Sequence, residues 1–94
     1  MNNDVLKLRM RDNSMRDRWL KTIARNNEIV GISWTDDYEE ADDFTDIQTF
    51  IHVVPTRILK YLRYLGKHNR EFFFDKEEHI DTRFFNSMIE YKGE

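Results

Sequence analysis

The 94-residue sequence contains no cysteine, one proline and three glycines. Without cysteine, the chain can form no disulfide, thiolate nucleophile or cysteine-ligated metal site. Glycine at only three positions rules out a glycine-rich phosphate loop or a dinucleotide fingerprint. No apolar run resembles a signal peptide or reaches membrane-spanning length, so we expect a cytoplasmic protein. These absences predict a protein that is not an enzyme and uses no cofactor or metal.

Aromatic residues are what the chain has in quantity: seven Phe, four Tyr and two Trp. Each of these side chains buries a large apolar area, which offsets the short length of the chain. We therefore expect one globular domain over residues 1–94.

The net charge of −3 conceals a strong segregation of charge along the chain. Residues 36–46 carry seven acidic side chains and no basic one, whereas residues 47–70 carry five basic side chains and no acidic one. This arrangement favours function through local charged surfaces rather than through net charge.

Periodicity predicts four strands and three helices. Residues 5–11 alternate apolar and basic side chains, which indicates a half-buried strand, and 28–34, 47–54 and 70–75 are further expected strands. Helical spacing predicts helices over 15–26, over 57–66 after a Thr56 cap, and over 83–91 after Asp81 or Thr82. A rival interpretation replaces the first strand and helix with one helix over 4–26.

This order predicts a ferredoxin-like α+β sandwich of two βαβ halves, with an acidic helical insert between strands 2 and 3 and an extra C-terminal helix. The extra helix would cover the second face of the sheet. If Phe84 and Phe85 were exposed on that helix, they would instead favour a dimer.

The acidic stretch TDDYEEADDFTD, residues 35–46, does not match the EF-hand calcium loop, whether the loop starts at Asp36 or at Asp37. In both cases other residues occupy positions that require a calcium ligand or glycine. Tyr38, Ala41 and Phe44 recur at helical spacing, and Asp36 with Glu39 matches a capping box, which predicts a short helix over 37–44. Its carboxylates would be solvated, would face the protein's own basic side chains, or would face a basic partner.

The leading functional hypothesis is a small non-enzymatic binding protein that acts through charge-complementary protein–protein contacts. Such a protein could be a regulator or inhibitor from a phage or mobile element. In one variant of this hypothesis, its carboxylates mimic the phosphates of DNA and occupy the binding groove of a DNA-binding protein. The expected partner-binding residues are those of the insert: Asp36, Asp37, Tyr38, Glu39, Glu40, Asp42, Asp43, Phe44 and Asp46.

The alternative hypothesis is direct nucleic-acid binding by a basic platform on two helices. Basic residues recur at helical spacing in 15–26 and again in 57–67, opposite the apolar residues of each segment. In the expected fold both helices pack on one side of the sheet and their basic faces align. The platform would consist of Arg18, Lys21, Arg25, Lys60, Arg63 and Lys67.

Overall fold

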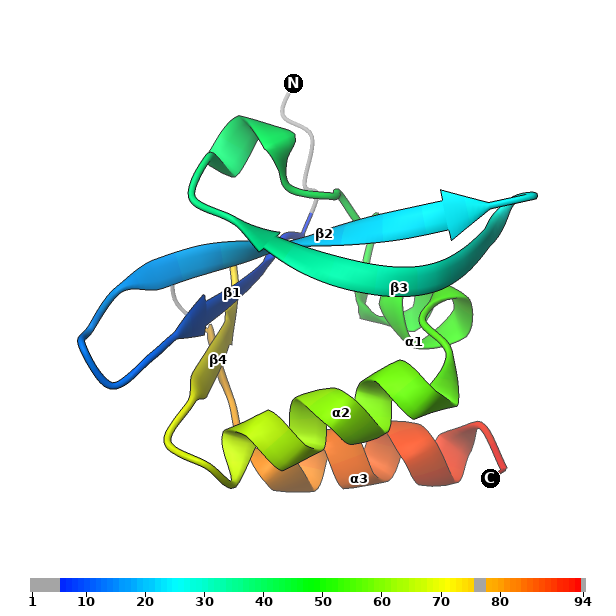
Figure 1. Cartoon of the computed structure of the whole chain (residues 1–94). Coiled ribbons are helices and arrows are strands. Elements are labelled where there is room, and N and C mark those ends of the chain that lie inside the picture. Colours follow the sequence, from blue (N-terminus) through cyan, green and yellow to red (C-terminus); the bar gives the residue numbers. More distant parts are fainter. Residues whose placement is uncertain (1–5, 76–77, 94) are drawn as a thin grey trace.

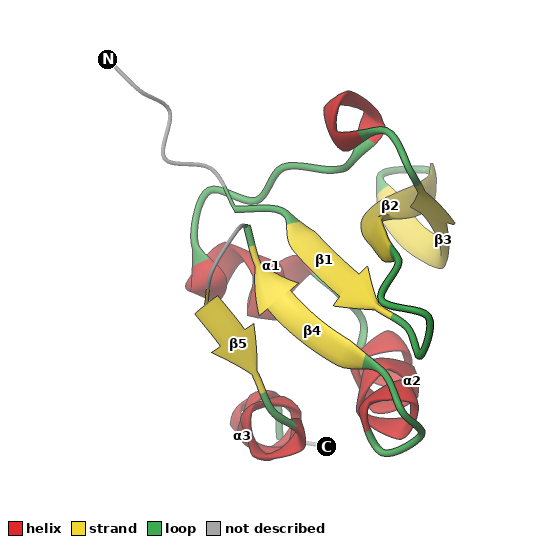
Figure 2. Cartoon of the chain, turned by 90° about the vertical axis from the view of Figure 1, so that its left-hand side faces the viewer, coloured by secondary structure: helices red, strands yellow, loops and turns green. Residues whose placement is uncertain are grey.

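The computed structural model describes residues 6–75 and 78–93, and over these residues it is an α+β domain with one five-stranded antiparallel sheet. The strands are β1 (Leu8–Arg11), β2 (Asp17–Arg25), β3 (Glu28–Thr35), β4 (Glu71–Phe74) and β5 (Glu78–Ile80). The helices are the short 3₁₀ helix η1 (Tyr38–Glu40), α1 (Ile47–Val53), α2 (Thr56–Gly66) and α3 (Thr82–Tyr91). The strand order is β3-β2-β1-β4-β5 (Figure 1, and Figure 2 for β5).

The α+β class is confirmed, but the order of strands and helices is not the predicted βαβ-βαβ order. The predicted helix over 15–26 is strand β2, and the predicted strand over 47–54 is helix α1. Neither predicted βαβ half therefore forms. The rival single helix over 4–26 is also wrong, because β1 and β2 occupy that region.

Strand β2 forms because the chain turns back sharply at its end. Asn26 and Asn27 have φ values of 56° and 66°, the left-handed pair that a two-residue hairpin turn requires. The turn brings Arg25 opposite Glu28 and pairs β2 with β3 along their length. The backbone hydrogen bonds between β2 and β3 therefore stabilise a strand in 15–26, although the spacing of its apolar residues is typical of a helix.

Helix α1 forms because Asp46 caps it. The Asp46 carboxylate accepts the backbone N–H of Thr49 at 2.8 Å. Phe50, Ile51 and Val54 then fall on one side of the helix and are buried in the core. Tertiary packing of this apolar face overrides the strand propensity of the β-branched residues.

The hydrophobic core lies between one face of the sheet and the three α-helices. The sheet contributes Phe72 and Phe74 of β4, which make edge-to-face contacts with Phe85 of α3 and Phe50 of α1, both at 5.4 Å between ring centroids. Figure 2 shows β1, β4 and β5 with the helices behind and below them. The predicted cover of both sheet faces is therefore wrong.

The structure gives no support to a dimer through exposed phenylalanines on α3. Phe85 is fully buried, and Phe84 packs against the core.

Of the two predicted caps of α3, Asp81 or Thr82, the structure has Asp81, because its carboxylate accepts the N–H groups of Arg83 and Phe84.

The predicted range of α2 is one residue too short at its start. The N-cap is Pro55 rather than Thr56, and the last helical residue is Gly66, as predicted. A Cβ atom on Gly66 would come within 2.9 Å of the Thr82 side chain, so glycine lets the end of α2 approach the start of α3.

We expect the Asn27→Ala substitution to lower the free energy of unfolding by about 1 kcal/mol, because alanine is strained in the left-handed conformation. Asn27→Gly should be neutral or slightly stabilising. Urea denaturation measures both. Asn13→Ala, in the exposed β1–β2 turn, is the matched control. Equal stability of the two Asn27 variants would contradict this explanation of the hairpin.

Candidate functional site

The outer face of the sheet, which none of the α-helices in the described residues covers, carries a layer of arginines and aromatic rings. The guanidinium carbon of Arg9 lies 4.3 Å from the ring centroid of Phe73 and 5.9 Å from that of Trp19. Arg11 lies 5.1 Å from the Phe73 centroid. Asp17 binds Arg9 at 3.0 Å and Arg11 at 2.9 Å. Asp17 therefore neutralises part of the charge of these two arginines.

The two arginines also change the titration of Asp17. The hydrogen bond from Arg11 is the main cause that lowers the pKa of the Asp17 carboxyl, and the hydrogen bond and positive charge of Arg9 act in the same direction. Partial desolvation opposes them but does not prevail.

Lys7, on the same face as Arg9, is a buried cation. It holds residues 36–46, which we call the acidic segment, against the sheet. Its ammonium donates to the carbonyl oxygens of Tyr38 at 2.8 Å and Ala41 at 3.3 Å. It pairs with Asp43 at 3.1 Å and lies 4.3 Å from the centroid of the Tyr38 ring. A charge-assisted bond of this kind is stronger than one between neutral groups.

Other carboxylates of the acidic segment also have partners within the protein. Asp36 pairs with Arg16 at 2.8 Å and approaches Arg18 at 3.9 Å. Asp42 accepts the backbone N–H of Thr22 at 2.9 Å and also accepts its hydroxyl. The acidic segment therefore faces the protein's own basic side chains at several points.

The local structure of the acidic segment is shorter than predicted. The expected helix over 37–44 is only the three-residue η1, and its cap is Asp37 rather than Asp36. Glu40 accepts the Thr35 hydroxyl at 3.1 Å, and the buried Phe44 packs edge-to-face on Phe50. Docking of a basic partner on this segment stays a prediction.

The predicted six-charge platform does not form. Arg18, Lys21 and Arg25 lie on β2, where alternation turns Arg18 to one face of the sheet and Lys21 and Arg25 to the other. Arg63 points at α3 and donates to the Asn86 side chain at 2.7 Å. Of the expected platform, only Lys60 and Lys67 remain together as exposed side chains along α2.

A different surface takes the place of the platform on α2 and the two residues that follow it. Exposed side chains recur there at helical spacing, and none of them is acidic. The Tyr61 and Tyr64 side chains are 46% and 57% exposed, and the Tyr64 ring lies 4.2 Å from the His68 ring. We call this surface the α2 face: Arg57, Lys60, Tyr61, Tyr64, Lys67 and His68.

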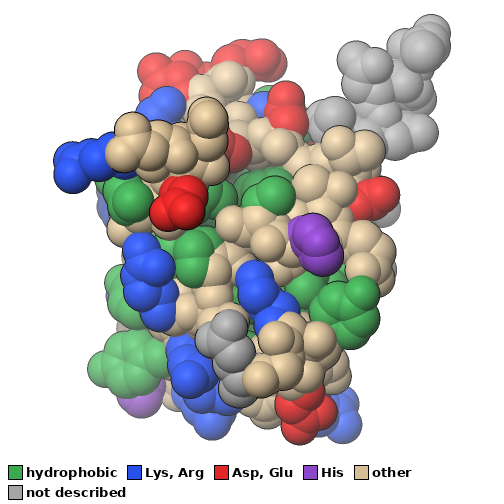
Figure 3. All heavy atoms as spheres, turned by 90° about the vertical axis from the view of Figure 1, so that its right-hand side faces the viewer, with side chains coloured by type: hydrophobic (Ala, Val, Ile, Leu, Met, Phe, Trp, Pro, Cys, Tyr) green, Lys and Arg blue, Asp and Glu red, His purple; other side chains and the backbone are tan. Residues whose placement is uncertain are grey.

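The cations of the α2 face form no ion pairs with carboxylates of the described residues. Among the residues that the structure describes, no acidic side chain lies within ion-pair distance of Arg57, Lys60 or Lys67. Arg57 donates to the backbone carbonyl of Val30 at 2.9 Å, which positions its guanidinium without removing its charge. Figure 3 shows the largest gathering of carboxylates at the top of the molecule, together with some Lys and Arg side chains, whereas in the lower part Lys and Arg side chains predominate.

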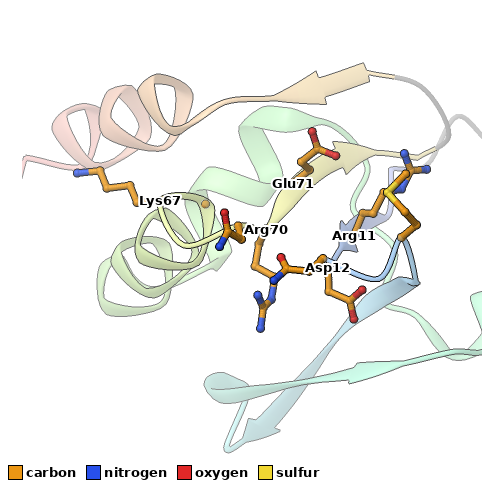
Figure 4. Close-up of a pocket in the computed structure, with 9 residues that line it drawn as sticks. Arg11, Asp12, Lys67, Arg70 and Glu71 are labelled. Carbon is orange, nitrogen blue, oxygen red and sulfur yellow. The ribbon is translucent and has the colours of Figure 1, made fainter.

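A hollow of about 440 Å³ lies at the C-terminal end of α2, beside the β1–β2 turn. Arg11, Lys67 and Arg70 line it together with Asp12 and Glu71 (Figure 4). Since cations and carboxylates occur together, the hollow is less suited to an anion than the α2 face.

Neither a metal centre nor a membrane span is found in the part of the chain that the structure describes. Within residues 6–75 and 78–93, no three histidine or carboxylate side chains are grouped as metal ligands. In the same ranges, no helix has both the length and the apolar composition needed to cross a membrane.

Comparison with known proteins yields no relative. No protein-family model matches the chain, and no curated protein or solved structure matches it either.

Four members of the α2 face are not among the residues predicted for the platform: Arg57, Tyr61, Tyr64 and His68. They follow the same helical spacing as Lys60 and Lys67, so the signal was present in the sequence.

We expect Lys7→Met to lower the free energy of unfolding by about 2–3 kcal/mol, because it leaves Asp43 and two carbonyl groups without their charged donor. Urea denaturation measures this loss. Lys21→Met, at an exposed position, should change it by about 0.5 kcal/mol or less. Similar stabilities of the two variants would show that Lys7 does not hold the acidic segment.

We expect Asp17→Asn to weaken the pH dependence of stability in acid. A lowered pKa in the folded state stabilises the protein above the unfolded-state value of about 3.9, and this contribution disappears as the pH falls through the folded-state pKa. The stability difference between wild type and Asp17→Asn should therefore shrink below about pH 4. Denaturation at a series of pH values tests this, and a constant difference would contradict it.

Proposed function

We propose that this protein is a non-enzymatic nucleic-acid-binding protein that holds the phosphate backbone on the α2 face. The observation that supports this most strongly is the composition of that face, where every exposed side chain is a cation, a tyrosine or a histidine. A helix surface that serves only solubility generally mixes charges of both signs. Here the segment 47–70 has no carboxylate at all.

The tyrosines favour nucleic acid over an acidic protein as the ligand. Exposed aromatic rings between cations provide surfaces on which bases stack, while the cations neutralise phosphates. From Arg57 to Lys67 the helix extends about 15 Å, long enough to follow several nucleotides. An acidic protein would use the cations but would not need two exposed tyrosines.

The acidic segment lies away from the α2 face, at the top of Figure 1, with α2 below the sheet. Salt screens exposed charges beyond about 10 Å at 0.1 M ionic strength, so the net charge of −3 does not forbid local phosphate binding. The contacts on α2 should then be the main source of affinity.

We expect Lys60→Glu combined with Lys67→Glu to reduce affinity for single-stranded DNA or RNA at least tenfold at about 50 mM salt. The slope of log Kd against log salt should fall by about 0.7 for each phosphate that the variant no longer neutralises. Fluorescence anisotropy with a labelled oligonucleotide measures both quantities.

Lys21→Glu with Arg25→Glu is the matched control, because it makes the same change in net charge on the outer face of the sheet. This variant should bind within about threefold of wild type. Absence of binding of any DNA or RNA by wild type at about 50 mM salt would overturn the proposal.

Glu39→Lys separates this proposal from docking through the acidic segment. Glu39 is exposed, whereas Asp43 binds the buried Lys7 and its reversal would disturb the fold. We expect Glu39→Lys to maintain or raise nucleic-acid affinity. A loss of affinity in this variant would point to the acidic segment instead.

A further inference from the structure

A groove of about 440 Å³ lies beside the first turn of α2, between the β2–β3 turn and the junction of α1 with α2. Its apolar wall consists of Ile29, Val53 and Pro55. Arg57 lines the groove and also belongs to the α2 face, so the two surfaces are continuous.

The groove is held open by contacts within the protein. The Lys92 ammonium, which also lines it, donates to the carbonyl oxygens of Ile51 at 2.9 Å and Val54 at 2.6 Å. Arg57 is tied to the Val30 carbonyl on the opposite side. These bonds connect the C-terminus of α3, the end of α1 and the hairpin, so a ligand meets a preformed shape.

We infer that the groove receives one unstacked base of a single-stranded nucleic acid whose backbone follows the α2 face, an inference that rests on the proposed function. A base has apolar faces and polar edges, and the groove offers both kinds of contact. Ile29, Val53 and Pro55 suit the faces. Asn27, Glu28 and His52 line the same groove and provide donors and acceptors for an edge.

A phosphate alone would not need this combination. A carboxylate such as Glu28 repels phosphate but accepts hydrogen bonds from the ring N–H or amino groups of a base, including the ring N–H of thymine. The volume of the groove falls in the range typical of small-ligand pockets. A base paired within a duplex cannot enter, because entry requires it to leave the stack. The groove therefore selects single strands.

The test compares three labelled probes of about twelve nucleotides: oligothymidylate, an abasic strand of equal length, and a duplex. The abasic strand has the same phosphates but no bases. Wild-type protein should bind oligothymidylate about tenfold more tightly than either of the other probes. Fluorescence anisotropy at fixed salt gives the three dissociation constants.

Val53→Gln places a neutral polar side chain at the apolar wall, at a position that is 46% exposed and therefore tolerant of substitution. This variant should lose most of the preference for oligothymidylate and retain the wild-type affinity for the abasic strand. Ile23→Gln is the matched control, since Ile23 is 48% exposed on β2 and does not line the groove. It should behave as wild type with all three probes.

The outcomes separate this inference from the proposed function. If wild type binds none of the probes, the proposed function fails and the inference with it. If wild type binds all three equally, or if Val53→Gln weakens all three alike, phosphate binding stands and the base-binding groove is overturned. The groove is also overturned if Val53→Gln keeps the wild-type preference for oligothymidylate, because stacking on Tyr61 and Tyr64 then accounts for that preference. A loss confined to oligothymidylate supports the groove.

Discussion

The structure depends on one constraint: all three α-helices pack on the same face of the sheet. Phe72 and Phe74 of β4 therefore point into a single core, and the outer face needs a cover that does not come from a helix. Strand β1 and the residue before it supply cations for this purpose. Lys7 binds the acidic segment across that face, and Arg9 lies over the ring of Phe73 while it binds Asp17. The outer face is therefore both polar and well packed.

This constraint also separates charges that stabilise the fold from charges that are available to a ligand. The acidic segment and the outer sheet face contain the largest numbers of charged side chains, yet many of these pair with one another, as Lys7 does with Asp43 and Arg16 with Asp36. The α2 face carries fewer charges, but no described carboxylate neutralises its lysines. Counting charge along the sequence would rank these surfaces in the opposite order. Pairing across the fold determines which charges a ligand can reach.

Local signals predicted correctly the elements whose pattern and packing agree. The alternation in 5–11 indicated β1, and the apolar face of α2 and the Asp81 cap of α3 indicated those helices. Two of the errors arose where a local signal competed with a longer-range one. In 15–26, apolar spacing suggested a helix, but Asn26 and Asn27 allow a hairpin that pairs β2 with β3. In 47–54, β-branched residues suggested a strand, but Asp46 caps a helix whose buried face fills the core.

By itself, the sequence determined the α+β class, the abundance of aromatic residues and the segregation of charge, and that α2 presents a basic face opposite its apolar one. These properties follow from composition and from periodicity within a single element, which need no knowledge of neighbours. Only the tertiary structure decided that β2 is a strand, that Arg63 donates a hydrogen bond to Asn86, and that Lys7 forms an ion pair with Asp43. Each of these depends on a contact with another element of the fold, and such contacts exist only once the chain has folded.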